Sequence, residues 1–213
     1  MNADAAWLDR LAHDLRSPLA PLQTASYLLQ RDDLDPARRQ ELLAMLERQT
    51  RRLARMLDEL DDWTRAGRSR LLGKSERCEL ALLLDYALVG SGLAGTAVED
   101  TGAGAEVDGD QQRLTQLLRT LLEYAIARGA APRLALRSGD GRAQVEVRVS
   151  GPPPGAEDLA ALLERPQPDP FDEGLGLRLM LAREIARAHG GELTAAVDAG
   201  ALVMRAELPL AHP

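Results

Sequence analysis

Aromatic residues are scarce in this chain of 213 residues, which contains one Phe, two Trp and three Tyr. Any hydrophobic core must therefore be built from Leu, Ala and Val rather than from large rings. The sequence is nevertheless 45% hydrophobic and 28% charged, which is the balance of a folded globular protein. Its length is sufficient for two modest domains or one larger domain.

The chain also has few cysteines and no long apolar run, and its acidic residues outnumber its basic residues. The single Cys78 cannot form an internal disulfide, which fits a reducing cytoplasm. The net charge of −7 argues against nucleic acid or an anionic membrane as a partner. No apolar run is long enough to span a bilayer, and the amino terminus lacks the character of a signal peptide. We therefore expect a cytoplasmic protein and, if Met1 is the true start, one without a sensor domain or membrane anchor.

A histidine beside a carboxylate is the most informative feature that is present. Residues 13–19 read HDLRSPL, and the apolar residues around them recur at alternating spacings of three and four, which is typical of an amphipathic helix. In this pattern His13 falls on the side that faces water. An exposed imidazole can act as a nucleophile, because the carboxylate of Asp14 can take the proton from one ring nitrogen while the other attacks. Pro18 lacks an amide hydrogen and predicts a bend close to this site.

Two long helices are predicted in the first third of the chain. The first covers residues 4–30, and the second begins at Asp35 and Pro36, a side-chain cap followed by proline at the first helical position, and ends near Gly67. A short loop between such helices makes an antiparallel hairpin. Each apolar stripe is wider than one partner helix can cover, so we expect a homodimer with a four-helix bundle. The alternative is that a second domain covers the excess apolar surface.

The rest of the chain predicts an α+β protein in which residues 1–67 form the hairpin, 68–77 a linker and 78–213 a two-layer α/β sandwich. Helices are expected at 80–89, 110–128, 156–164 and 177–189, and strands at 96–100, 105–108, 133–137, 143–150, 192–197 and 201–208.

The HDLRSPL stretch resembles, at every position, the phosphoacceptor box of two-component sensor histidine kinases. The resemblance implies that His13 carries a phosphoryl group and that Asp14 is its acid/base partner. It also implies that Arg16 and Ser17 contact the incoming phosphate or the partner protein.

A partner surface follows from the same resemblance. A response-regulator receiver domain would dock on the hairpin just below the histidine, on residues such as Pro21, Leu22 and Ala25 and on the facing part of the second helix at 48–55. A hybrid or sensor histidine kinase is a further possible partner.

Residues 79–210 resemble the ATP-binding domain of histidine kinases, of the kind shared with Hsp90-type ATPases, but with substitutions. The family has Asn at the positions of Thr120 and Tyr124, and the second Asn holds magnesium, an oxygen-ligand task for which tyrosine is badly suited. The family's adenine-recognising Asp is replaced by Gly151, which has no side chain to accept a hydrogen bond. Pro153 replaces a glycine and fixes φ in that loop.

One glycine motif of the family survives. Residues 174–177 read GLGL, and a glycine-rich turn that opens a helix can present amide hydrogens to phosphate. Gly174 and Gly176 are therefore candidate, vestigial cofactor-binding residues, although the loss of the other motifs favours a tight turn before a packed helix as their explanation. Residues 165–173 are short and proline-rich where the family has a longer mobile lid. We expect no bound cofactor and no metal site, with magnesium supplied by the receiver partner.

Three functions are consistent with these features. The first is a histidine phosphotransferase that exchanges a phosphoryl group between His13 and receiver aspartates without ATP. The second is an active sensor kinase core with an atypical ATP site. The third is a non-catalytic pseudokinase that binds a response regulator or a kinase.

Overall fold

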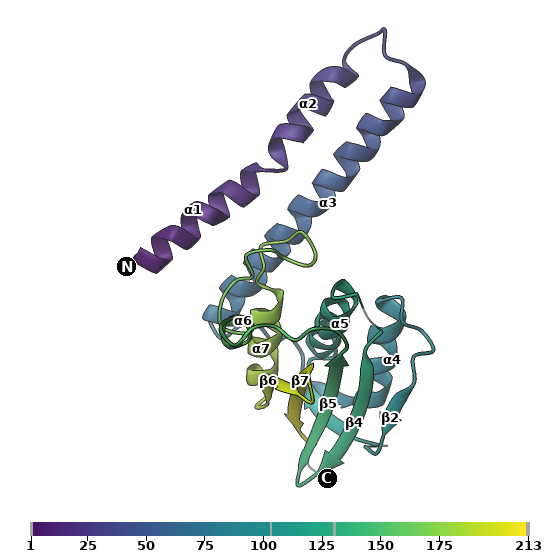
Figure 1. Cartoon of the computed structure of the whole chain (residues 1–213), viewed down its shortest axis with the longest axis vertical. Helices are drawn as coiled ribbons and strands as arrows, with labels where there is room; N and C mark the ends of the chain where they lie inside the picture. The colour runs from purple at the N-terminus through teal and green to yellow at the C-terminus, as the bar shows by residue number, and fades with distance from the viewer. Residues whose placement is uncertain (1, 103, 130, 212–213) are drawn as a thin grey trace.

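The computed structural model describes residues 2–102, 104–129 and 131–211. They form a long helical hairpin followed by an α/β domain, which we call the globular domain (Figure 1). The α+β fold and the order of its two parts are therefore as the sequence predicts. Among the described residues, none of the helices combines the length and the apolar character needed to cross a bilayer.

The first arm of the hairpin is broken, contrary to the single helix predicted over residues 4–30. Helix α1 (Asn2–Arg16) ends before Pro18 and α2 (Leu19–Leu29) begins after it. The missing amide hydrogen and fixed φ of proline explain the break, and they confirm the bend expected at this position. Figure 1 shows the change of direction between the two helices.

The second arm is one helix, α3 (Pro36–Gly67), with the predicted start and end. Asp35 caps it, because its Oδ2 accepts hydrogen bonds from the backbone N–H of Ala37 at 3.1 Å and of Arg38 at 3.2 Å. Since the first-turn N–H groups have no partner within the helix, this cap stabilises the turn at the tip of the hairpin.

The globular domain has one main sheet of five strands in the order β2-β4-β5-β7-β6. The strand β2 pairs with β4 in parallel and the other pairs are antiparallel. A smaller antiparallel sheet pairs β1 with β3. The bounds are β1 (Glu76–Glu79), β2 (Val98–Asp100), β3 (Glu106–Gly109), β4 (Arg133–Gly139), β5 (Arg142–Val149), β6 (Glu192–Asp198) and β7 (Ala201–Pro209). Because β1 starts at Glu76, the linker is shorter than the predicted 68–77.

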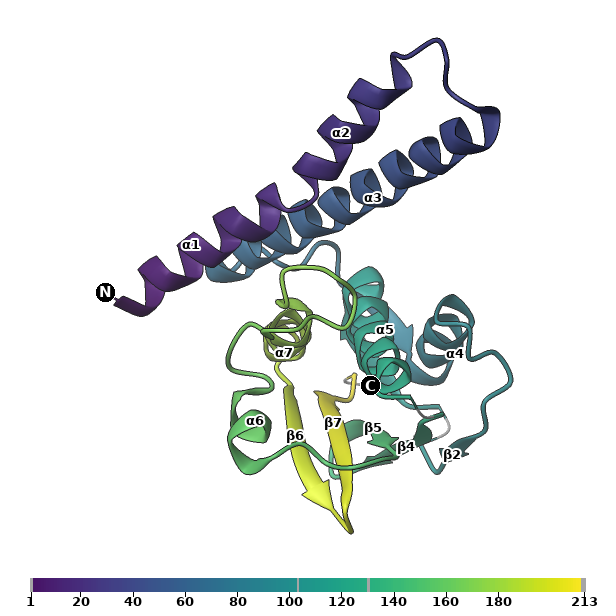
Figure 2. The same ribbon diagram turned by 45° about the horizontal axis from the view of Figure 1, so that its top comes forward.

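Helices α4 (Leu80–Gly90), α5 (Gln111–Ala127) and α7 (Arg178–Ala188) lie on one face of the five-stranded sheet, while the short α6 (Ala156–Ala161) lies beside β6 (Figure 2). The core between these layers is mostly Leu, Ala and Val, as the scarcity of aromatic residues requires. Val145, Val147 and Val149 of β5 point into it, which confirms the alternation predicted for this strand.

A separate apolar cluster joins the hairpin to the globular domain. Its buried members are Met56 of α3 together with Leu175, Leu177 and Leu181 at the start of α7. Half-buried residues from both arms of the hairpin surround them: Trp7, Leu11, Leu15, Leu60 and Trp63. We call this set the interdomain cluster. This cluster covers part of the hairpin's excess apolar surface. Packing of the globular domain, which the sequence analysis gave as the alternative to a dimer, therefore accounts for some of that surface.

Candidate functional site

His13 lies in the last turn of α1 with its side chain 81% exposed. Its Nδ1 atom is 3.3 Å from Oδ1 of Asp14, whose side chain is 33% exposed. When Nδ1 carries the ring proton and faces this carboxylate, Nε2 keeps the lone pair that can attack an electrophile. The expected exposure of His13 is confirmed, and the pair has the arrangement that a nucleophilic imidazole needs.

The break after α1 keeps the neighbouring candidates accessible. Arg16 and Ser17 are both exposed, whereas Pro18 is buried in the hairpin. The backbone N–H of Ser17 donates to the carbonyl of His13 at 2.9 Å, which closes the turn that carries the histidine. The structure therefore brings His13, Asp14, Arg16 and Ser17 together at one bend.

The predicted partner surface needs one correction. Pro21 and Leu22 are half-buried in α2 and present some surface, but Ala25 is fully buried. The small side chain of Ala25 is covered inside the hairpin, so it cannot contact a docked protein in this arrangement.

The two substituted positions of α5 are occupied by engaged, buried side chains. The Thr120 hydroxyl donates to the carbonyl of Gln116 at 2.9 Å and accepts from Nη2 of Arg178 at 3.4 Å. Tyr124 is 7% exposed, and its ring meets that of Phe171 edge to face, with centroids 5.6 Å apart. Burial raises the pKa of the Tyr124 phenol, which keeps it neutral.

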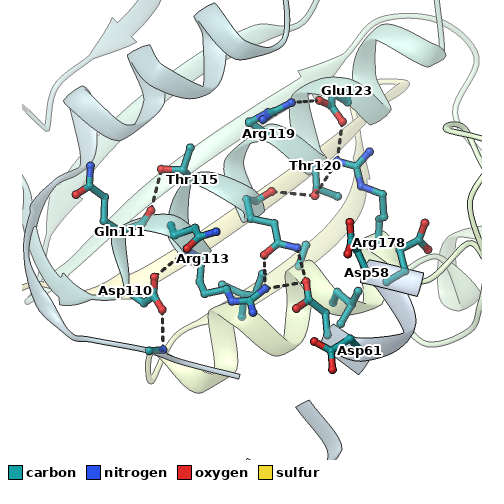
Figure 3. A pocket seen from close by; sticks show the side chains of 18 of the residues that line it. Asp58, Asp61, Asp110, Gln111, Arg113, Thr115, Arg119, Thr120, Glu123 and Arg178 are labelled. Carbon is teal, nitrogen blue, oxygen red and sulfur yellow. Dashed lines mark hydrogen bonds and ion pairs between the residues drawn. The ribbon is translucent and has the colours of Figure 1, made fainter. Parts of the chain in front are cut away.

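Arg178, at the start of α7, ties α5 to the loop before it. It forms ion pairs with Glu123 at 2.6 Å and with Asp172 at 3.3 Å, and its guanidinium lies 5.1 Å from the centre of the Phe171 ring. Figure 3 shows Arg178 beside Glu123 and Thr120, with Arg119 bonded to the other side of Glu123. This network and the Tyr124–Phe171 contact hold the loop of residues 165–176 against α5.

The turn after β5 is built around glycine. Gly151 has φ +111°, a conformation that other L-residues rarely adopt, so an aspartate here would be strained. Nη2 of Arg128 donates to the carbonyl of Pro152 at 2.8 Å and fixes the next peptide.

Gly176 is required by its positive φ and by close backbone packing, and Gly174 leaves room for a neighbouring side chain. A Cβ on Gly176 would overlap the carbonyl oxygen of Gln167, whose N–H donates to the Gly176 carbonyl at 3.0 Å. A Cβ on Gly174 would overlap the carboxylate of Glu59, which reaches this turn from α3. This packing is consistent with the tight turn named as the alternative, and cofactor binding by these glycines stays a prediction.

Glu59 accepts hydrogen bonds from the amide groups that this turn presents. Its carboxylate receives the backbone N–H of Leu175 at 3.2 Å and that of Leu177 at 3.1 Å. The side chain is buried, and burial, followed by repulsion from Asp172, raises the pKa of Glu59 to about 7. A carboxyl group of the chain itself thus accepts the amide hydrogens that this turn presents.

A cleft of about 1300 Å³ opens between α3 and the helices of the globular domain. Figure 3 shows Asp58 and Asp61 of α3 on one side and Thr115 and Arg119 of α5 on the other. Its charges are mixed in sign. Within the described ranges, no group of three or more His, Cys, Asp or Glu side chains is arranged to hold a metal ion.

Two known families match separate parts of this chain. Residues 5–69 match the His Kinase A (phospho-acceptor) domain, and residues 109–212 match the histidine kinase-, DNA gyrase B- and HSP90-like ATPase family. The chain belongs to the two-component sensor histidine kinase family. It is a phosphotransfer core of the histidine kinase type, and the first match contains the HDLRSPL stretch.

Similar proteins agree with this assignment. The sensor protein ChvG of Agrobacterium fabrum is 27% identical over 226 residues, covering 95% of this chain and 38% of that protein. The sensor histidine kinase ZraS of Klebsiella oxytoca is 32% identical over 194 residues, covering 87% of this chain and 41% of that protein. The chain therefore spans less than half the length of these relatives.

Solved structures show the same fold. The Acinetobacter baumannii histidine kinase AdeS has a TM-score of 0.70 at 18% identity, covering 94% of this chain and 98% of that one. The histidine kinase ThkA, solved in complex with the response regulator protein TrrA, has a TM-score of 0.73 at 21% identity, covering 96% of this chain and 61% of that one.

Glu59, Phe171 and Arg178 are the residues of interest that the sequence analysis missed. A signal was present for Glu59, because it lies three residues after Met56 and one before Leu60, so it is a charge within the apolar stripe of α3. Phe171 is the only phenylalanine of the chain, and it falls in the short proline-rich loop where the family has a longer lid. Neither signal identifies the contact that the residue makes.

Proposed function

We propose that this chain is a histidine phosphotransfer protein that exchanges a phosphoryl group between His13 and the aspartate of a response-regulator receiver domain, without using ATP of its own. The supporting observation is a contrast within the molecule. His13 is exposed beside its carboxylate, whereas Tyr124 and Phe171 pack together where the family binds nucleotide.

The transfer step needs little from this chain besides an accessible imidazole. Nε2 of His13 attacks the phosphorus of the receiver's phosphoaspartate, so that a P–N bond forms and the acyl P–O bond breaks. The receiver's carboxylate leaves with the bonding electron pair. The imidazole gains positive charge as it attacks, and Asp14 stabilises this charge through the proton on Nδ1. The reverse step passes the group to a second receiver.

The side chains at the family's nucleotide positions do not fit a magnesium–ATP complex held in the family's way. Tyr124 offers a neutral phenol engaged with Phe171 instead of an amide oxygen. Gly151 offers no acceptor for an adenine amino group. The amides beside Gly174 are already bonded to Glu59. These three observations support a role without ATP.

A homodimer is part of the same proposal. Large apolar side chains remain exposed along the hairpin, and they extend over both arms: Leu19, Tyr27, Leu43 and Leu57. A second hairpin would bury them in a four-helix bundle. The receiver would then dock near Pro21 and Leu22. The similar histidine kinase ThkA, solved in complex with the response regulator protein TrrA, supports a partner of this kind.

An ATP-dependent kinase is the second candidate. It is supported by the relatives, because ChvG is named a sensor protein and ZraS a sensor histidine kinase, and each match spans most of this chain. Under this reading the loop of residues 165–176 would have to move away from α5, breaking the ion pairs of Arg178.

Labelling experiments separate the candidates. The purified chain is incubated with γ-labelled ATP and magnesium, and in parallel with receiver domains that carry labelled phosphoaspartate. We expect label on His13 from a phosphorylated receiver and none from ATP, and no label in His13→Gln. Calorimetry with ATP, with and without magnesium, is expected to show no binding.

The other outcomes are equally informative. Label transferred from ATP to His13 would establish the kinase and overturn our proposal. A chain that binds receivers but takes label from neither donor would be a non-catalytic binding module, and His13→Gln would then leave binding unchanged.

A further inference from the structure

Glu59 connects the two parts of the molecule through a contact that the phosphotransfer chemistry does not use. It sits on α3 of the hairpin, and both of its hydrogen-bond donors, the N–H groups of Leu175 and Leu177, belong to the globular domain. The side chain is only 6% exposed. Gly174 lacks the Cβ that would exclude the carboxylate, so the turn is shaped to receive it.

The charged groups near Glu59 lie on the loop before α7, on α7 itself and on its own helix, α3. Asp172 in the loop repels its negative charge, and Arg178 of α7 attracts it more weakly. On its own helix, Asp62 is already paired with Arg113 of α5 at 2.7 Å. The repulsion and the burial together outweigh the attraction and the two amide bonds, so the carboxylate holds a proton far more readily than an exposed glutamate does.

We propose that Glu59 is a proton-operated latch, which holds the globular domain on the hairpin when it is protonated and weakens that docking when it ionises. The carbonyl oxygen of the neutral acid still accepts the two amide hydrogens, whereas the ionised form places a buried negative charge beside the carboxylate of Asp172. The rest of the interface would remain as it is: the interdomain cluster, the Asp62–Arg113 pair and the bond from Arg52 to the carbonyl of Glu173 at 2.9 Å.

The latch lies close to the phosphoacceptor helix, which gives it a regulatory position. Leu11 and Leu15, on either side of His13 in the chain, belong to the interdomain cluster that the latch closes. Arg52, within the stretch of α3 expected to face a receiver, is held by the loop of the globular domain. Release of the latch would therefore free surface on both arms of the hairpin.

Hydrogen exchange at the two bonded amides measures the latch directly and needs no phosphotransfer. In the wild type, the protection factors of the Leu175 and Leu177 amides should fall about tenfold for each pH unit between about pH 5 and pH 7, and become constant above pH 7. In Glu59→Gln, which keeps a neutral carbonyl acceptor, they should not change with pH.

Two further variants complete the test. Asp58→Asn removes the same charge from the preceding, exposed position of α3 and should behave as the wild type. Glu59→Ala removes the acceptor and should lower protection at every pH. It should also make Trp7 and Trp63, the chain's only tryptophans and both part of the interdomain cluster, more accessible to acrylamide quenching.

The proposal would be overturned by a pH dependence that persists in Glu59→Gln, or by protection factors in the wild type that are independent of pH. It would also be overturned if Asp58→Asn abolished the effect. None of these results depends on whether His13 exchanges phosphate with a receiver or with ATP.

Discussion

The hairpin and the globular domain keep different parts of the kinase pattern. In the hairpin, the reactive stretch matches the family at every position, and the structure leaves His13 exposed beside Asp14. In the globular domain, the strands and helices are retained, but the two Asn positions expected from the family are Thr120 and Tyr124, and the buried Tyr124 packs against the half-buried Phe171. The fold of a domain and the chemistry of its site therefore have to be assessed separately.

This contrast also explains how such a domain remains stable. Around Tyr124 and Thr120, polar side chains pair with one another, as Arg178 does with Glu123 and Asp172. Buried groups with partners inside the chain do not depend on a bound ligand to satisfy them.

The largest expected effect tests the hairpin side of the comparison. Replacing Asp14 with Asn removes the negative charge that stabilises the imidazolium while keeping the shape of the side chain. We expect the initial rate of phosphoryl transfer from a labelled receiver to fall about 10²-fold. Asp32→Asn, an exposed change at the hairpin tip, is the matched control and should leave the rate unchanged. A rate within threefold of the wild type for Asp14→Asn would remove Asp14 from the mechanism.

The next effect tests the globular side. Leu121 of α5 is fully buried, so Leu121→Ala should lower the free energy of unfolding of this domain by about 2 to 5 kcal/mol, measured by urea denaturation. Under native conditions, the rate of phosphoryl transfer from a receiver to His13 should change little, because Leu121 lies in the core of the globular domain and not at the phosphoacceptor site.

A matched leucine gives the control for that prediction. Leu82 of α4 is 45% exposed, so Leu82→Ala should change the free energy of unfolding by no more than about 0.5 kcal/mol. If Leu121→Ala stopped phosphotransfer while the globular domain remained folded, the globular domain would take part in the reaction at His13. The hairpin's chemistry could then not be assessed separately from that domain.

The sequence was most informative where a local pattern determines the structure. The cap at Asp35, the exposure of His13 and the inward valines of β5 follow from residue type and spacing, and all are confirmed. The position of Glu59 shows where this reasoning stops. Its partners, Leu175 and Leu177, are more than 100 residues away in the sequence, and no periodicity relates the two segments.

The broken first helix and the burial of Ala25 have a similar explanation. Apolar spacing continues through Pro18, so the pattern alone favours one helix, and only the missing N–H of proline separates it into two. Ala25 was predicted from its position below His13, but burial depends on how closely the two arms approach, which the spacing does not specify.

The pH dependence of stability sharpens the comparison at the junction of the two parts. The pKa of Glu59 is about 7 in the folded chain and near 4.5 when it is exposed, so the folded state binds the extra proton between these values. The contribution of Glu59 to the free energy of unfolding is fully present below about pH 4.5. It falls as the pH rises from 4.5 to 7 and does not change further above pH 7. The loss corresponds to about 3 kcal/mol.

Comparison with Glu59→Gln isolates this contribution from that of the other carboxylates. The difference in free energy of unfolding between the wild type and Glu59→Gln, from urea denaturation at several pH values, should change by about 3 kcal/mol between pH 4.5 and 7. A difference that stays constant over this range would show that Glu59 ionises as an ordinary surface residue does, and the junction would then carry no pH sensitivity.

The smallest expected effect is at the tip of the hairpin, far from the globular domain. It tests whether a local loss of hairpin stability reaches the contact between the two parts. Asp35→Ala removes the acceptor for the N–H groups of Ala37 and Arg38 and should lower the free energy of unfolding by about 1 kcal/mol. Asp35→Asn keeps an acceptor and should recover most of that loss. Because the cap is remote from the interdomain cluster, the protection of the Leu175 and Leu177 amides should not change. A loss of their protection in Asp35→Ala would mean that the hairpin and the globular domain unfold as one unit. The two parts could then still be compared by their chemistry, but their stabilities would not be independent.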